Sequence, residues 1–147
     1  MKFLRNRWLL GLIVIVFFIL DRLTKYLFTR DISNERCFFI EPIINKGIVF
    51  GIPLAASLKT IFFILIIFAL LFLMSWLIRS WAAGNKLKIF SLLLILLGAF
   101  SNLMDRINIG GVIDFIDLRI WPVFNLADMM IVAGIAFLFL NKADSKK

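Results

Sequence analysis

The sequence predicts an all-α membrane protein with four transmembrane helices and a small, partly β-structured extracytoplasmic loop region. Hydrophobic residues make up 63% of the 147-residue chain, and 17 residues are phenylalanine, which is more apolar surface than one small soluble core could bury. A bilayer core about 30 Å thick takes roughly 20 helical residues per crossing. This length therefore allows about four spans in a single domain, residues 1–147.

The first apolar run begins at Trp8 after three basic residues, and its helical pattern continues to Phe28. A cleaved secretory signal would carry small residues soon after its apolar stretch, whereas charged and bulky residues follow here. We therefore predict a first span over about residues 8–28. Asp21 and Lys25 lie four residues apart on one face of it, where they can neutralise each other as a structural ion pair near the outer leaflet.

Three further apolar runs predict the remaining spans, over about residues 58–77, 87–104 and 124–140. A glycine-asparagine break separates the second span from the third, and a polar segment separates the third from the fourth. Four crossings put both termini on one side. The two terminal segments and the loop of residues 79–88 hold nine Lys and Arg residues against one acid, so we predict that they are cytoplasmic and that both polar segments face outward.

The first polar segment, residues 29–57, is rich in turn-forming residues and has short stretches typical of β-structure. Within it, Asn45-Lys46-Gly47 offers an amide and a flexible glycine that could contact a peptide backbone. The apolar stretch of residues 37–40 could lie on the membrane surface as a lid, with Phe38 and Phe39 dipping into lipid.

The end of the third apolar run carries a polar cluster. Gly98, Asn102 and Arg106 share one helix face because they are spaced by four residues. Gly98 would let a neighbouring backbone approach, and Asn102 could hydrogen-bond across helices. Asp105 with Arg106 could form an ion pair or brace an outer loop. Helix packing and direct substrate contact are equally open for this cluster.

The charge and the residue types exclude several functions. The net charge of +8 could indicate nucleic-acid binding, but the basic residues form short clusters at the ends of apolar runs, without a basic face or a nucleic-acid motif. The chain has one cysteine, Cys37, and no histidine. Internal disulfides, His-based metal sites and His-dependent triads are therefore excluded, and we expect neither a metal nor a cofactor.

Two aspartates in apolar surroundings are the strongest candidates for chemistry, because ionisable residues at membrane depth are costly. Asp128 lies about one turn into the fourth span and Asp114 precedes it in a turn-rich stretch, so only a fold-back could bring them together. Two carboxylates that share a proton titrate apart, one ionised and one neutral, as an aspartic protease requires. A helix cap explains Asp128 alone about equally well. Asp117 is expected to be a solvated loop carboxylate.

Five motifs, in this order, resemble those of the bacterial lipoprotein signal peptidases (signal peptidase II family) over nearly the whole chain. The family's Asp-x-x-x-Lys, Asn-x-Gly-x-x-Phe, Gly-x-x-x-Asn-x-x-Asp-Arg, Val-Asp-Phe-Ile-Asp and Phe-Asn-x-Ala-Asp look like Asp21 to Lys25, Asn45 to Phe50, Gly98 to Arg106, Ile113 to Asp117 and Phe124 to Asp128. The chain departs from many members after Asn45-x-Gly47, where Ile48 and Val49 stand in place of small alanines.

The resemblance implies an aspartic endopeptidase with Asp114 and Asp128 as the catalytic dyad. The residues that would line or support the site are Asn45, Gly47, Asn102, Asp105, Arg106 and Asn125. The implied substrate is a diacylglyceryl-modified prolipoprotein, cut just before the lipidated cysteine, and the implied inhibitor is the cyclic peptide antibiotic globomycin. The implied location is the bacterial cytoplasmic (inner) membrane, among membrane lipids, with the active site near the outer face. A monomer is the expected state, and no nucleic-acid partner is expected.

Two other function classes are compatible with four helices. A small proton-coupled exporter could use a buried carboxylate, but such a carrier should have an acid near the midpoint of a span. Asp21 and Asp128 lie toward the outer ends, and no predicted span contains Glu. A non-enzymatic assembly factor would leave two membrane-level aspartates without a role. The sequence therefore favours the peptidase.

Overall fold

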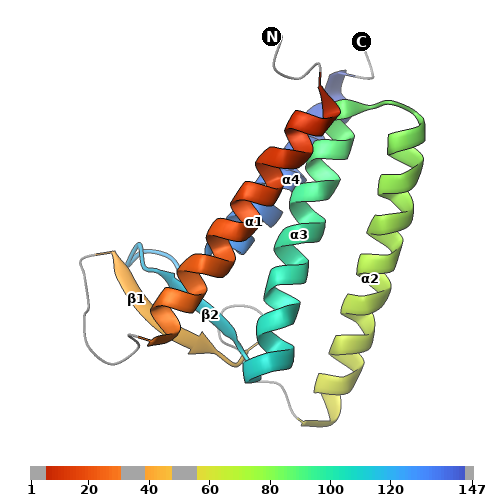
Figure 1. Cartoon of the computed structure of the whole chain (residues 1–147). Coiled ribbons are helices and arrows are strands. Elements are labelled where there is room, and N and C mark those ends of the chain that lie inside the picture. The colour runs from red at the N-terminus through yellow and green to blue at the C-terminus, as the bar shows by residue number, and fades with distance from the viewer. Residues whose placement is uncertain (1–5, 31–38, 48–55, 145–147) are drawn as a thin grey trace.

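The computed structural model describes residues 6–30, 39–47 and 56–144. Over these residues the chain forms four helices and two short strands (Figure 1). The helices are α1 (Arg7–Arg30), α2 (Ala56–Ala82), α3 (Lys86–Ile109) and α4 (Leu126–Asp144), and the strands are β1 (Ile40–Asn45) and β2 (Val112–Ile116). The mostly helical class with a small β-structured region is confirmed, and each predicted span coincides with most of one helix.

The end of α3 differs from the prediction. The helix continues five residues past the predicted span end at residue 104, to Ile109, and includes Arg106 on the helix face predicted for it. It ends where Gly110 adopts a left-handed conformation with φ of 72° and donates its N–H to the carbonyl of Arg106. A glycine in this conformation is a common helix terminator, because a side chain would be strained there.

The two strands come from the two polar segments and pair as an antiparallel sheet. The register places Ile43 opposite Asp114 and Asn45 opposite Val112, with an irregularity between Ile40 and Ile43. The sequence predicted β-structure only in the first segment. Val112-Ile-Asp-Phe-Ile is an almost continuous apolar run, and such a short run has no periodicity that identifies a strand. The sheet lies beside the lower half of α1, above the lower ends of α2 and α3 (Figure 1).

The central helix is α3, which contacts each of the other three helices. Two glycines bring α3 and α4 close together. A Cβ on Gly98 would lie 2.5 Å from the carbonyl oxygen of Ala127, and one on Gly134 would lie 2.6 Å from that of Ser91. The close approach predicted at Gly98 is confirmed, and it brings the start of α4 directly against α3.

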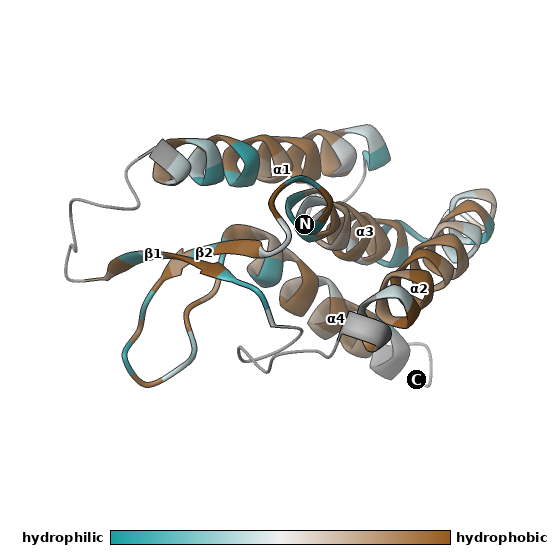
Figure 2. Ribbon diagram, turned by 90° about the horizontal axis from the view of Figure 1, so that it is seen from below, coloured by the Kyte–Doolittle hydropathy of each residue, from teal (hydrophilic) through white to brown (hydrophobic). Residues whose placement is uncertain are grey.

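Two helices are long and apolar enough to cross a membrane, over Thr60–Ala82 and Lys86–Ile109 of the residues described. A shorter apolar stretch, Leu126–Asn141, lies in α4. The outer faces of the helices are largely hydrophobic (Figure 2), and α2 exposes apolar side chains along most of its length. This surface suits contact with lipid. The start of α1 and the end of α4 lie at the same end of the bundle (Figure 1).

Candidate active site

Asp114 and Asp128 both bind one residue, Asn125. The Asn125 Nδ2 atom donates to Asp114 Oδ1 at 2.6 Å. Its Oδ1 atom accepts from the backbone N–H of Asp128 at 2.9 Å, and its own backbone N–H donates to Asp128 Oδ2 at 3.3 Å. This reciprocal pair is a capping box at the start of α4. The cap interpretation of Asp128 therefore holds, and the cap also brings its carboxylate beside that of Asp114.

Phe124 makes the fold-back that joins the two aspartates. Its carbonyl accepts from the N–H groups of Phe115 and Ile116 at 3.0 and 2.8 Å, and its N–H donates to the carbonyl of Ile116 at 3.1 Å. The chain thus returns to β2 before α4 begins, and Asn125 comes next to the strand that carries Asp114. The sequence indicated a fold-back but not this pairing, because one isolated bridge has no sequence signature.

The other oxygens of the pair accept from two more asparagines. Asn45 Nδ2 donates to Asp114 Oδ2 at 2.9 Å, and Asn102 Nδ2 donates to Asp128 Oδ1 at 2.7 Å. The side chain of Asn45 is held in turn by the backbone N–H of Gly47, which donates to its Oδ1 at 3.0 Å. Three of the supporting residues predicted from the family motifs therefore contact the two carboxylates directly.

The surroundings of the two carboxyl groups differ. The pKa of Asp114 is raised to about 6. Burial is the largest cause and the nearby charge of Asp128 also raises it, while hydrogen bonds from Asn45 and Asn125 lower it. Asp128 lies in the first turn of α4, where backbone N–H groups and the helix dipole favour a negative charge. A carboxyl group with a raised pKa that feels the charge of a second carboxyl group is the arrangement in which a pair can share one proton.

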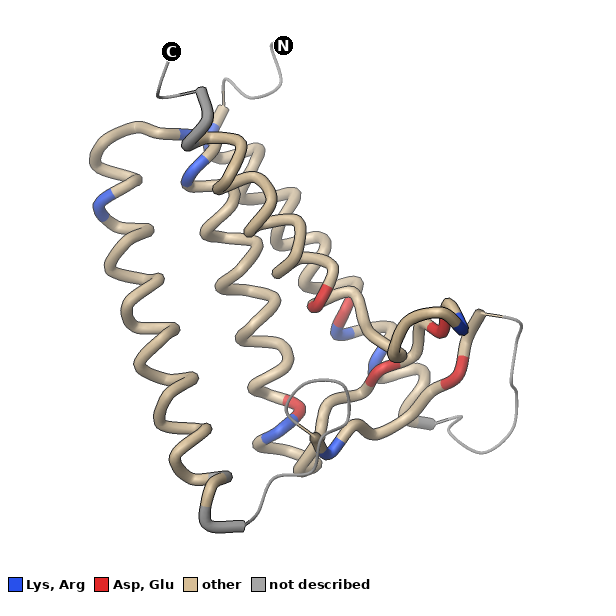
Figure 3. Tube along the Cα trace, turned by 180° about the vertical axis from the view of Figure 1, so that it is seen from behind, with Lys and Arg blue, Asp and Glu red and all other residues tan. Residues whose placement is uncertain are grey.

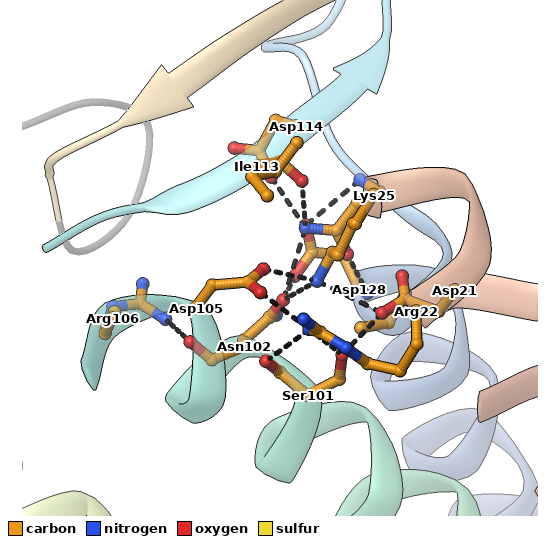
Figure 4. A network of polar contacts seen from close by, with 12 residues as sticks. Asp21, Arg22, Lys25, Ser101, Asn102, Asp105, Arg106, Ile113, Asp114 and Asp128 are labelled. Atoms are coloured by element: carbon orange, nitrogen blue, oxygen red, sulfur yellow. Dashed lines mark hydrogen bonds and ion pairs between the residues drawn. The ribbon is translucent and has the colours of Figure 1, made fainter. Parts of the chain in front are cut away.

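Beneath the pair lies a cluster of buried charges (Figure 4). The Lys25 Nζ atom is 3.1 Å from Asp21 and 2.8 Å from Asp105, and Arg22 is 2.6 Å from Asp105. Two cations thus balance two anions. Such a balance is needed at membrane depth, because an unpaired buried charge is strongly destabilising. Asp105 pairs with Lys25 and Arg22 on α1, which the sequence did not indicate.

Asn102 connects this cluster to the aspartates. Its Oδ1 atom accepts from Lys25 Nζ at 2.9 Å and from Asn125 Nδ2 at 3.2 Å. Because the amide oxygen faces these two donors, its Nδ2 atom faces Asp128. The ammonium group of Lys25 thereby fixes which end of the Asn102 amide the carboxylate meets, as the dashed contacts in Figure 4 indicate.

Two residues of the cluster were not among the predicted site residues. The hydroxyl of Ser101 donates to Asp21, and Arg22 donates to that hydroxyl at 3.0 Å. Arg22 could have been found from the sequence, because it is a third charge within an apolar helix. Ser101 could not, since a serine in a membrane helix usually bonds its own backbone. Asp21 also accepts from the backbone N–H of Ala127 at 2.8 Å, which joins α1 to α4.

The remaining predicted residues lie around this centre. The guanidinium of Arg106 lies 5.7 Å from the ring centroid of Phe62 on α2, and its Nη1 donates to the carbonyl of Asn102 at 3.4 Å. Asp117 is half-buried and accepts from the N–H of Arg119. The proposed lid residue Phe39 is exposed, whereas Cys37, Phe38, Ile48 and Val49 lie outside the described residues. Across residues 6–30, 39–47 and 56–144, no group of three or more His, Cys, Asp and Glu side chains could hold a metal ion.

The family model described as "Signal peptidase (SPase) II" matches residues 13–143. This chain belongs to the signal peptidase II family. The lipoprotein signal peptidase of Moorella thermoacetica is 38% identical over 137 residues, which cover 88% of this chain and 87% of that protein. The lipoprotein signal peptidase of Syntrophomonas wolfei is 39% identical over 138 residues, with coverages of 88% and 89%.

Solved structures support the same assignment. A bacterial membrane enzyme determined by the in meso method at 2.3 Å resolution matches with a TM-score of 0.78 and 29% identity, over 92% of this chain and 88% of that chain. The family inferred from five short motifs is therefore confirmed, and signal peptidase II membership makes the chain a membrane-embedded protease. The exporter interpretation finds no support in these matches.

Proposed function

We propose that this signal peptidase II removes the signal peptide from diacylglyceryl-modified prolipoproteins by an aspartic mechanism, and cuts just before the lipidated cysteine. The observation that carries the aspartic mechanism is the position of Asn125. This residue binds the Asp114 carboxylate through its side chain and Asp128 through the two hydrogen bonds of the capping box, one of them from its backbone N–H to the carboxylate. The charge of Asp128 also acts on Asp114, which supports a shared proton.

In the proposed reaction, ionised Asp128 takes a proton from a water molecule as the water oxygen attacks the scissile carbonyl. Neutral Asp114 gives its proton to the carbonyl oxygen, which yields a tetrahedral diol. Asp128 then passes its proton to the leaving nitrogen while Asp114 takes one back from the diol. The peptide bond breaks to give a carboxyl group on the signal peptide and an amine on the lipidated cysteine, and both aspartates return to their starting states.

The supporting residues have separate proposed roles. Asn45, Asn102 and Asn125 orient the carboxylates by donating to them. Asp21 and Lys25 form the structural ion pair, which Asp105 extends. The remaining supporting residues, Gly47 and Arg106, border the site from the β1 side and the α2 side.

We further propose that all four helices cross the bacterial inner membrane as one monomeric domain, residues 1–147, with both termini cytoplasmic and the active site near the outer face. The position of the basic residues supports this orientation, because Lys and Arg favour the cytoplasmic side. Most described Lys and Arg residues outside the site lie at the end where α1 starts and α4 ends (Figure 3). Membrane lipids and a globomycin-class peptide inhibitor are the other proposed partners.

The test is cleavage of a lipid-modified prolipoprotein in detergent micelles by the wild type, Asp114→Asn and Asp128→Asn. Asparagine keeps the size of the side chain but cannot ionise. Loss of at least 10³-fold in kcat is expected for each variant, because each removes one proton-transfer group.

Asp117→Asn is the matched control, since it lies on the same segment and can still accept from the N–H of Arg119. It should cleave at the wild-type rate. Folded Asp114→Asn or Asp128→Asn protein that still cleaves within tenfold of the wild type would refute the aspartic mechanism.

A further inference from the structure

Between the two elements that carry the aspartates, the chain presents a patch of outward-facing apolar side chains. Leu118, Ile120 and Trp121 are 44%, 92% and 59% exposed. The segment that contains them projects away from the helices (Figure 2). We refer to residues 118–121 as the β2–α4 tip. Adjacent exposed apolar residues of this kind mark a surface that meets something other than water.

The conformation of the tip is defined by its own contacts. Asp117 Oδ1 accepts from the N–H of Arg119 at 2.7 Å, and Arg119 has a φ of 62°, in the left-handed region that non-glycine residues seldom adopt. At the base, the N–H of Asp117 donates to the carbonyl of Phe39 at 3.1 Å, and Phe124 pairs with Ile116. An ordered turn thus holds the apolar side chains outward.

The depth of the tip follows from the length of α4. The apolar stretch of α4 runs from Leu126 to Asn141, which at about 1.5 Å per residue spans roughly 24 Å. The hydrocarbon layer is about 30 Å thick, so α4 is several ångströms short. α1 has 24 residues, or roughly 36 Å, and α4 ends level with the start of α1 (Figure 1). The shortfall therefore lies at the active-site end, where the tip begins.

A contact between α1 and α4 gives the same level. The N–H of Ala127, at the start of α4, donates to Asp21, and α1 continues beyond Asp21 to Arg30. Those additional residues correspond to roughly 13 Å of helix. Figure 3 shows the segment between β2 and α4 at the level of this part of α1 along the bundle, and not beyond the helix ends. In the proposed four-crossing arrangement, this level lies within the leaflet on the active-site side.

We propose that the β2–α4 tip is a lipid-binding surface, with the side chains of Leu118, Ile120 and Trp121 inserted among the acyl chains just below the phospholipid headgroups. Exposed apolar side chains also occur on α4, the helix that follows the tip in the chain, at Met129 and Val132. This continuity favours lipid over a protein partner. A tryptophan at such a level is typical of the aromatic belt of membrane proteins.

Insertion of the tip fixes the depth of the active site. Asp114 lies on β2, which precedes the tip, and Asp128 lies at the start of α4, which follows it. The chain on each side of the tip therefore leads to one of the two carboxylates. Its partner is the bulk phospholipid leaflet. The inference depends on the proposed membrane insertion of α1 and α4, but not on the catalytic mechanism.

The test is spin-label accessibility in phospholipid vesicles. Cys37→Ser removes the only cysteine, and Ile120→Cys then carries a nitroxide label. Asn108→Cys is the matched control, because Asn108 is exposed in the last turn of α3 near the end of the bundle. At position 120 we expect collisions with oxygen, which concentrates in lipid, to exceed those with a water-soluble nickel chelate severalfold. At position 108 we expect the reverse.

Each other outcome overturns the proposal. A label at position 120 that collides with the nickel chelate as often as the label at position 108 does would place the tip in water. A label that is immobile and reached by neither reagent would mean that protein covers the tip, and dipolar broadening between labels would identify that protein as a second copy. The signal peptidase activity of each labelled protein is measured separately. The collision rates report the depth of the label whether or not the protein cleaves its substrate, so failure of the proposed function and failure of this inference can be told apart.

Discussion

Lys25 is the most consequential single residue outside the two aspartates. It is fully buried in α1 and contacts Asp21, Asp105 and Asn102 at the same time. Its charge balances the buried cluster, while its position orients the amide that donates to Asp128. One ammonium group therefore has a structural role and a positioning role, and different substitutions can separate them.

We predict that Lys25→Met unfolds at a much lower temperature than the wild type, with a loss of about 3–5 kcal/mol, because Asp105 and Asp21 would then outnumber the one remaining cation, Arg22. Adding Asp105→Asn restores the balance and should recover most of that stability. Activity should stay low in the double variant, since nothing then donates to Asn102 from α1. Thermal unfolding in detergent and peptide cleavage measure the two effects. A double variant that loses as much as both single variants together contradicts the charge-balance argument.

The pKa of Asp114 predicts the alkaline side of the pH profile. Burial raises this pKa to about 6, and the proposed reaction needs the protonated form. As pH rises above about 6, kcat/KM of the free enzyme should fall about tenfold per unit. A shared proton also predicts a fall in rate on the acid side, because one carboxyl group of the pair must be ionised to act as the base. Asp117→Asn should follow the same profile, and a flat profile between pH 5 and 8 would argue against a shared proton.

At the scale of elements, the contact between α3 and α4 positions the site. Gly98 and Gly134 allow backbone atoms of the two helices to touch, and Asn102 on α3 then reaches Asp128 on α4. Small residues at a helix contact are a usual basis of packing in membranes, where helices gain little from the hydrophobic effect.

We predict that Gly98→Ala destabilises the protein by about 1–3 kcal/mol, because its Cβ would lie 2.5 Å from the carbonyl of Ala127. Activity should fall as well, since Ala127 directly precedes Asp128. Gly11→Ala is the control, because no atom lies within 4 Å of its Cβ and alanine favours a helix interior. Thermal unfolding in detergent compares the two. If Gly98→Ala proves as stable as Gly11→Ala, the close contact is not limiting.

The elements differ in how far the sequence could predict them. The hydrophobic runs predicted all four helices, because an apolar run of that length is a strong signal for a helix. The predicted third span stopped at residue 104 because Asp105 is charged, and the cations on α1 that pair with Asp105 are known only from the folded chain. The pairing of β1 with β2 could not be predicted, because it joins segments far apart in the chain with no repeated pattern.

The site shows the same division. Asp114 and Asp128 stood out because carboxylates in apolar sequence are costly, and the family motifs singled out their asparagines. The motifs did not indicate that Asn125 connects both aspartates. Nor did they show which carboxyl group is the more easily protonated, because that depends on burial and neighbouring charges, which only the folded chain defines.

At the scale of the whole molecule, the number of crossings decides the orientation, and reporter fusions can count them. With four crossings, a reporter after Gly84 and one at the C-terminus should both be cytoplasmic. If only α2 and α3 cross, the two reporters must lie on opposite sides. A fluorescent protein that folds only when it stays in the cytoplasm should fluoresce both after Gly84 and at the C-terminus. A reporter after Lys46 should be dark, and alkaline phosphatase should be active there.

The hydrogen bond from Ala127 to Asp21 joins residues 106 positions apart. The site therefore cannot assemble during synthesis until the ribosome has made the chain past Asp128. Before α4 is made, α1 and α3 can already form their ion pairs with Asp105. Asp128 and Asn125 are still absent, so neither can join Asp114. The nascent chain should thus be inactive until α4 has been made. A stalled or truncated chain that ends before Leu126 should leave lipoprotein precursors uncut.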